Sequence, residues 1–318
     1  MRAADVVVLS WNGTEHSLVS LSALASASIA DALWQGPNIR VCEMSLDGDA
    51  IDLSSLPAQA VVFPVALGRA NSGRLQQELE GAGLGFVGSG SRSCRATHDE
   101  RVWRPLLAQA RVPVAQYIVC DRADDVVAAA ATAAASFLGG CQVRPSLRSA
   151  MPPHFGGVIA SSVQACIEEV LETSGSAVIE PLQAGGRTLS LACLSDGDLV
   201  HSLPVVEVVE SWNADRPTMY TAFDTHYACP AAIDGALRRA LDDIAAAVHR
   251  ALACVMSQTE VHLGADGRLA VNACDAAPLL LPSSLFARAA AGAGVDFAQL
   301  TRRLVDASRQ RRPRESNS

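Results

Sequence analysis

Three short, strongly apolar runs near the N-terminus restrict the fold of this chain more than any other feature. They lie at residues 6–9, 60–65 and 86–87, and apolar residues at helical spacing separate them at about 18–33 and 73–84. Buried strands that alternate with helices are typical of a parallel sheet whose crossover connections are helical. We therefore expect an α/β domain with a parallel sheet at the start of the chain.

The pattern changes twice along the rest of the chain. Strand-like runs at 117–119, 141–145 and 177–180 alternate with helical patterns at about 100–110, 126–137 and 163–173, and a Ser-, Pro- and Gly-rich loop covers 146–157. This predicts a small α+β unit. Runs at 189–194, 199–203 and 205–209 then predict an antiparallel sheet, which two strands at 259–263 and 269–271 extend. A long helix at about 233–252 and two closing helices complete the expected elements.

Charge and cysteine usage limit the location and the partners of the protein. The 318 residues carry a net charge of −8, which argues against nucleic acid or an anionic membrane as the main partner. The first residues show no secretory signal pattern, and the nine cysteines have neither CxxC nor metal spacing. Scattered thiols of this kind are typical of a reducing compartment. We expect a cytoplasmic protein.

The chain contains no lysine, because all 25 of its Lys and Arg residues are Arg. Arginine keeps its charge and offers a planar fork of donors, but it does not reproduce the compact, flexible ammonium of lysine at a phosphate. The absence becomes informative if the fold normally places a lysine at its active centre.

Three ordered landmarks resemble the D-alanine–D-alanine ligases of the ATP-grasp superfamily. They are TEHSLVSLSA at 14–23, then VFPVALG, GRLQQELE and GFVGSG between 62 and 90, and finally LPVVEV at 203–208 with YACPA at 227–231. The resemblance covers about residues 5–305. It implies an ATP-grasp fold, α/β and α+β, with an N-terminal parallel-sheet (pre-ATP-grasp) domain at 1–97. It also implies a central subdomain at 98–183, a C-terminal subdomain at 184–306 and a disordered tail at 307–318.

Ligases of this family phosphorylate the carboxylate of one D-alanine with ATP and Mg²⁺, and the amine of a second D-alanine then attacks the acyl phosphate. Such a reaction needs cations for the triphosphate, carboxylates for the metal ions, donors for the oxyanion and a lid that excludes water.

The phosphate clamps depart from the family pattern. A family Asp-Lys pair reads Asp99-Glu100 here, and a carboxylate at Glu100 repels phosphate. The family's Val-Lys-Pro strand has Arg144 in place of its lysine. Arg148 lies in the following loop, where two prolines remove backbone donors. The lid is shortened to about 220–227 and has no lysine.

The nucleoside position keeps Glu180, but Arg187 replaces the glutamate that grips the ribose hydroxyls in the family. A cation does not accept those hydrogen bonds. The oxyanion arginine is replaced by Gln258. Glu260 and Asp275 remain as possible ligands of one metal ion, because Ala273 stands where the family has its bridging glutamate.

The amino-acid pocket keeps Glu15, which resembles the residue that grips the substrate ammonium, and also Ser284. Family residues at 67–68 and 70–73 are altered. Each of these residues also has a purely structural interpretation. Glu15 is suited to cap the helix that follows it, and Arg144 to pair with a neighbouring acid. Glu260 is suited to an outward-facing polar position, and Asp275 to a turn.

We interpret the chain as a degenerate, ligase-like pseudoenzyme with no ATP or Mg²⁺ cofactor. It would serve as a noncatalytic binding or regulatory partner in a cell-wall or biosynthetic pathway, with an unknown protein or a small amino-acid-like ligand. The resemblance also implies a homodimer. The alternative is an active ATP- and Mg²⁺-dependent carboxylate–amine ligase whose clamps are rebuilt from Arg144, Arg148 and Arg187. A third interpretation keeps the cleft for a small molecule without ATP.

Overall fold

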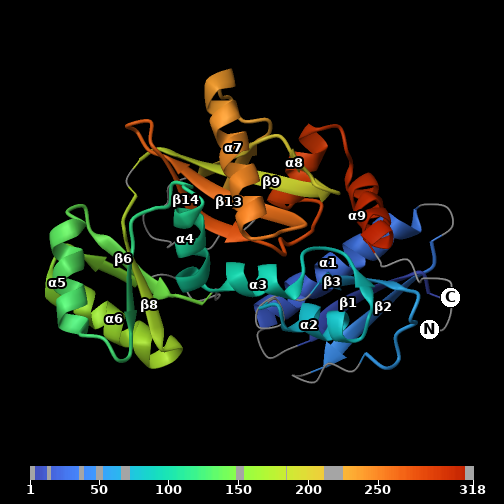
Figure 1. Ribbon diagram of the computed structural model, residues 1–318, viewed down its shortest axis with the longest axis horizontal. Coiled ribbons are helices and arrows are strands. Elements are labelled where there is room, and N and C mark those ends of the chain that lie inside the picture. The colour runs from blue at the N-terminus through green and yellow to red at the C-terminus, as the bar shows by residue number, and fades with distance from the viewer. Residues whose placement is uncertain are drawn as a thin grey trace.

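The described strands form three separate sheets, which follow one another along the chain and form three lobes (Figure 1). The computed structural model describes residues 4–12, 16–35, 39–47, 53–65, 72–147, 154–183, 185–210 and 225–311. In the described residues no helix is both long and apolar enough to cross a membrane.

The first sheet is parallel, as the sequence predicts, and has the strand order β2-β1-β3-β4. Its strands are β1 (Val6–Asn12), β2 (Val41–Asp47), β3 (Val61–Val65) and β4 (Gly85–Phe86), and its helices are α1 (His16–Trp34), α2 (Arg74–Gly81) and α3 (Ser91–His98). The pattern analysis did not identify β2. This edge strand alternates exposed Glu43 and Ser45 with less exposed neighbours, so it lacks the apolar run that marks a central strand.

The second sheet is antiparallel and has the order β5-β8-β6-β7. Its strands are β5 (Ile118–Asp121), β6 (Cys141–Pro145), β7 (His154–Gly157) and β8 (Ser176–Pro181). Helices α5 (Val126–Ser136) and α6 (Ala160–Ser174) belong to this lobe, whereas α4 (Glu100–Gln109) packs Trp103 and Leu107 into the core of the third sheet. Strand β7 lies inside the segment that we predicted as a loop. Its sequence HFGG carries two glycines, which weaken a strand signal.

The third sheet is antiparallel, as predicted, with the order β12-β11-β9-β13-β14 and with β10 paired to β9. The strands are β9 (Arg187–Asp196), β10 (Leu199–Ser202), β11 (Val206–Glu210), β12 (Thr225–Ala228), β13 (Met256–Leu263) and β14 (Leu269–Asp275). The helices that follow in this part of the chain are α7 (Gly235–Ala251), α8 (Leu285–Gly292) and α9 (Phe297–Arg311). The long helix and the two closing helices of the sequence prediction are thus confirmed.

One hydrophobic core joins the first lobe to the C-terminal part of the chain. Val8 and Phe63 of the first sheet share this core with Met256 of β13, Phe286 of α8 and Leu304 of α9. Figure 1 shows α9 beside α1, although these two helices come from opposite ends of the chain. Each sheet lies within one of the expected domain segments, but α9 packs on the first lobe. The domain division itself stays a prediction.

A buried histidine fixes α7 on the third sheet. His249 is 1% exposed, with Ser195 Oγ 2.8 Å from its Nε2 and Ser257 Oγ 2.7 Å from its Nδ1. Burial, assisted by neighbouring Arg250, lowers the pKa of His249 to about 4. The folded protein therefore holds a neutral imidazole at a pH where the unfolded chain already binds a proton.

Stability should accordingly fall as the pH drops from 6.5 towards 4. Between pH 7 and pH 5 we expect His249 to lower the free energy of unfolding by about 2 kcal/mol, because only the unfolded state is protonated there. Urea unfolding at the two pH values measures this difference. His249→Gln should remove most of it, whereas His201→Gln, at an exposed position of β10, should leave it unchanged. An equal pH dependence in all three proteins would contradict the assignment.

Candidate functional site

The N-terminus of α4 is fixed beside the end of β6. Asp99 caps the helix by accepting a hydrogen bond from the backbone N–H of Arg101 at 2.9 Å. The backbone N–H of Glu100 donates to the carbonyl oxygen of Ser146 at 3.0 Å. A carboxylate in the first turn is favoured by the helix dipole. The side chain of Glu100 is thereby held next to the strands that carry Arg144 and Glu180.

Glu100, Arg144, Glu180 and Arg104 form a closed ring of ion pairs. Arg144 donates to both carboxylate oxygens of Glu100, with Nη2 2.9 Å from Oε2, and its Nε lies 3.0 Å from Glu180 Oε1. Arg104 completes the ring, with Nε 2.7 Å from Glu100 Oε2 and Nη2 2.6 Å from Glu180 Oε2. Gln142 adds a hydrogen bond to Glu180 Oε1 at 2.6 Å. We call these five residues the ion-pair ring.

The ion-pair ring is buried and electrically neutral. Arg104 is 0% exposed, Glu180 8% and Glu100 9%, while the Arg144 side chain, at 22%, is the most accessible of the four charged groups. Arg104 also donates to the carbonyl oxygen of Ala115 at 3.2 Å. Two arginines balance two glutamates, so the ring has no charge left for an external anion.

Two further observations describe the surroundings of the ion-pair ring: aromatic side chains lie beside Arg104, and the pKa of Glu180 is shifted. The Arg104 guanidinium lies 4.8 Å from the ring centroids of Trp103 and Tyr117, a distance typical of cation–π contacts. Burial by itself would raise the pKa of Glu180, but Arg144 and Arg104 beside it bring this pKa below its ordinary value. Glu180 is therefore ionised within the ring at neutral pH.

Arg187 lies apart from this ring. Its guanidinium makes two hydrogen bonds to Glu207, at 2.6 and 2.7 Å, and a third to the carbonyl oxygen of Ala232. The hydrogen bonds from Arg187 lower the pKa of Glu207. Alternation along β9 puts Arg187 on the same face as Leu189, which packs in the core beneath α7. The structure therefore does not bring Arg187 and Arg144 into one cation cluster.

The expected metal and oxyanion positions lie on the other face of the third sheet. Gln258 pairs with Asp275 across β13 and β14, and Glu260 pairs with Ala273, so these side chains share one face. Asp275 Oδ1 accepts from the backbone N–H of Ala277 at 2.9 Å, as a turn residue does. No group of three His, Cys, Asp or Glu residues suited to a metal ion occurs among the residues that the structure describes. Metal binding by Glu260 and Asp275 stays a prediction.

A β-bulge re-directs one polar side chain of β14. The register shift after Glu260 leaves Asn272 as the extra residue of the strand. Its amide exchanges two hydrogen bonds with Gln183, at 2.9 and 2.6 Å, and so ties β14 to the segment after β8. A neutral amide pair thus joins the second and third lobes.

The structure gives Ser284 the role of a helix cap. It precedes α8, accepts from the backbone N–H of Ala287 at 3.4 Å and donates to the carbonyl oxygen of Leu281 at 2.8 Å. Glu15, Arg148, the altered pairs at 67–68 and 70–71, and residues 220–224 of the lid lie outside the described residues. Their predicted roles stay predictions.

Pattern reasoning missed two members of the ion-pair ring, Arg104 and Gln142. Both have a local signal. Arg104 follows Glu100 by four residues in a helix, and Gln142 precedes Arg144 by two residues in a strand, so each member of these pairs shares a face with the other. Neither spacing reveals that the two faces meet.

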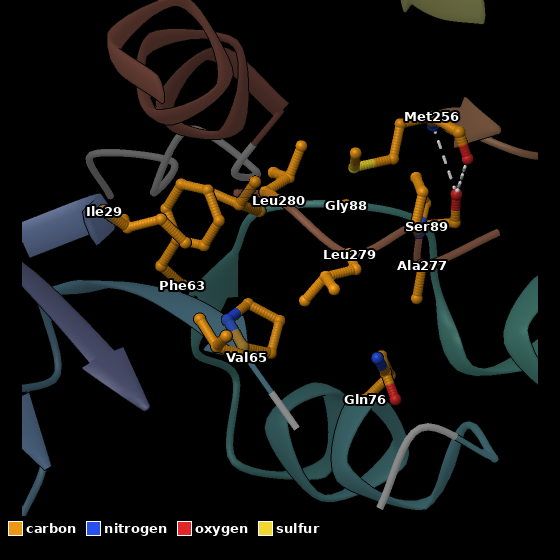
Figure 2. Close-up of a pocket in the computed structure, with 13 residues that line it drawn as sticks. Ile29, Phe63, Val65, Gln76, Gly88, Ser89, Met256, Ala277, Leu279 and Leu280 are labelled. Carbon is orange, nitrogen blue, oxygen red and sulfur yellow. Dashed lines mark hydrogen bonds between the residues drawn. The ribbon is translucent and has the colours of Figure 1, made fainter. Parts of the chain in front are cut away.

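A small apolar pocket lies where the first lobe meets the C-terminal part of the chain (Figure 2). Phe63 and Val65 of β3, Met256 of β13, and Leu279 and Leu280 of the segment before α8 contribute to its wall. The pocket lies beyond the carboxyl end of the parallel strand β3, where α/β sheets commonly bind ligands.

The described geometry matches known proteins across nearly the whole chain. The D-alanyl-alanine synthetase A structure from Vibrio cholerae superimposes with a TM-score of 0.82 over 98% of this chain and 99% of that chain, at 15% identity. The D-alanine–D-alanine ligase structure from Bacillus anthracis gives a TM-score of 0.79 at 16% identity, covering 98% and 99% of the two chains. The protein therefore has the ATP-grasp fold.

Sequence comparison shows the family. The model of the D-ala D-ala ligase C-terminus matches residues 106–306. The D-alanine–D-alanine ligase of Frankia casuarinae is 29% identical over 81% of this chain and 68% of its own length. That of Anaeromyxobacter dehalogenans is 28% identical over 92% and 94%. The chain belongs to the D-alanine–D-alanine ligase family.

Arg104→Leu should be strongly destabilising, because it leaves Glu100 and Glu180 buried without their shared cation. We expect the free energy of unfolding to fall by about 3–5 kcal/mol. Arg238→Leu is a matched control, since Arg238 makes an i,i+4 pair with Asp242 that is partly exposed; there we expect less than about 1 kcal/mol. Urea titration measures both. If Arg104→Leu does not fold, the milder variant Glu180→Gln can be measured in its place. A loss of unfolding free energy no larger than that of Arg238→Leu would contradict the stabilising role of the ring.

Proposed function

We propose that this protein is a ligase-family member that neither binds Mg-ATP nor joins amino acids, and that it acts as a noncatalytic binding or regulatory partner. The ion-pair ring carries this proposal. Glu100 and Arg144 occupy two positions where the resemblance expects lysines for phosphate, and Glu180 occupies the adenine position. In this chain the three side chains bind one another.

Electrostatics explains why this arrangement disfavours a nucleotide. A triphosphate needs a surplus of positive charge, but Arg144 is held by both Glu100 and Glu180. An incoming phosphate would have to displace these carboxylates from Arg144. A buried carboxylate deprived of a partner is costly, so displacement opposes phosphate binding.

The other catalytic requirements support the same proposal. Gln258 stands at the oxyanion arginine position and Ala273 at the bridging glutamate position. Arg187, which the alternative function needs as a clamp, is engaged by Glu207. This chain has the family fold but carries other residue types where the resemblance implies catalytic cations and carboxylates. Such a protein is suited to bind a partner or a small molecule rather than to turn over ATP. A cell-wall or biosynthetic pathway, a cytoplasmic location and a homodimer belong to this proposal.

Calorimetry with Mg-ATP tests the proposal directly. We expect no saturable heat up to millimolar nucleotide, with or without Mg²⁺, and no phosphate release when D-alanine is added, because the ring leaves no free cation for the triphosphate. The D-alanine–D-alanine ligase of Anaeromyxobacter dehalogenans is the positive control.

A micromolar dissociation constant for Mg-ATP would contradict the proposal. ATP turnover would then favour the alternative, an active ligase in which Arg144 is the most accessible cation of the ring. In that case Arg144→Ala should abolish turnover, whereas Arg238→Ala on α7, outside the ion-pair ring, should leave it unchanged.

A further inference from the structure

The apolar pocket between β3, the segment after β4 and the segment before α8 contains one polar group that the fold leaves unsatisfied. Gln76 of α2 is 3% exposed and lines the pocket. Its Oε1 is buried and has no hydrogen-bond partner within the described part of the protein. A buried amide without a partner costs free energy, so a complementary group is expected at this position.

The rest of the wall is apolar or already satisfied. Figure 2 shows Gln76 on the opposite side of the pocket from Ile29 and Phe63. Ser89, the other described polar side chain of the wall, donates its hydroxyl to the carbonyl oxygen of Met256 at 2.8 Å and accepts from two backbone N–H groups. None of the 13 lining residues that the structure describes has an ionisable side chain.

These features define the chemistry of a ligand. A free amino acid would bring an ammonium and a carboxylate, and neither would find a counter-charge among the described residues of this wall. A neutral molecule would place its apolar body against Phe63, Leu279 and Leu280 and its polar group on Gln76. The space for water-sized groups is about 30 Å³, enough for a molecule of a few heavy atoms.

We propose that this pocket binds a small neutral molecule that has a short apolar body and one amide or hydroxyl group, with Gln76 as the recognising side chain. This rests on the proposed function, because it names what a nonligating member of the family would bind at the junction of its lobes. Ser284, one of the residues expected for the amino-acid substrate, is not among the described residues that line the pocket.

Acetamide and acetate form a matched pair of probes, equal in size and different in charge. Met256 lines the pocket and is one of five methionines, so its ¹³C-labelled methyl resonance reports occupancy once Met256→Leu has identified it. We expect acetamide to shift this resonance saturably with a dissociation constant of about 1 mM or weaker, as its few atoms allow. Acetate and D-alanine should leave it unshifted.

Two variants on the same helix decide the role of Gln76. Gln76→Leu removes the amide at nearly constant volume and should weaken acetamide binding at least tenfold without loss of folding. Gln77→Leu is the control, because Gln77 is exposed and its side chain accepts from Arg95 instead. No saturable shift in the unmodified protein, a comparable shift with acetate, or undiminished binding in Gln76→Leu would each overturn the proposal. Mg-ATP binding would overturn the proposed function but would leave this Met256 readout intact.

Discussion

Arg104 is a guanidinium with no exposure to solvent, and its charge has to be balanced inside the protein. Glu100 and Glu180 supply that balance, and Arg144 neutralises the second charge that they bring. Because each of the four groups needs the others, the ring fixes α4 against β6 and β8. Gln142 and the carbonyl oxygen of Ala115 occupy further hydrogen-bonding capacity.

The neutrality of the ring has consequences beyond stability. A cation that faces a cleft attracts phosphate only while its charge is uncompensated, and Arg144 is compensated twice. Relative to the pattern that the family resemblance implies, the absence of lysine is one of several differences. A drift from lysine to arginine would keep the charge at position 144, but it does not account for a glutamate at position 100.

The alternation of side chains along the strands of the third sheet separates residues that the sequence alone suggests belong to one site. The alternative function groups Arg144 with Arg187, which stands where the resemblance implies a glutamate, yet the alternation along β9 directs Arg187 towards Glu207 on the α7 side. Gln258, Glu260 and Asp275 lie on the opposite face. The third sheet thus separates these polar side chains from Arg187.

Apart from α3, β2, β7 and β12, where the sequence predicted no helix or strand, the sequence alone determined the order of elements. It also determined the parallel character of the first sheet, the antiparallel character of the third, and the family resemblance. Those features follow from local apolar periodicity and short motifs. It could not identify β2 or β7, because an edge strand and a glycine-rich strand lack a continuous apolar run. It also could not show that Glu100, Arg104, Arg144 and Glu180 meet, since they come from one helix and two strands up to 80 positions apart. Only tertiary packing decided that these charges bind one another, because the energetic cost of leaving a buried charge unpaired depends on which distant residues surround it.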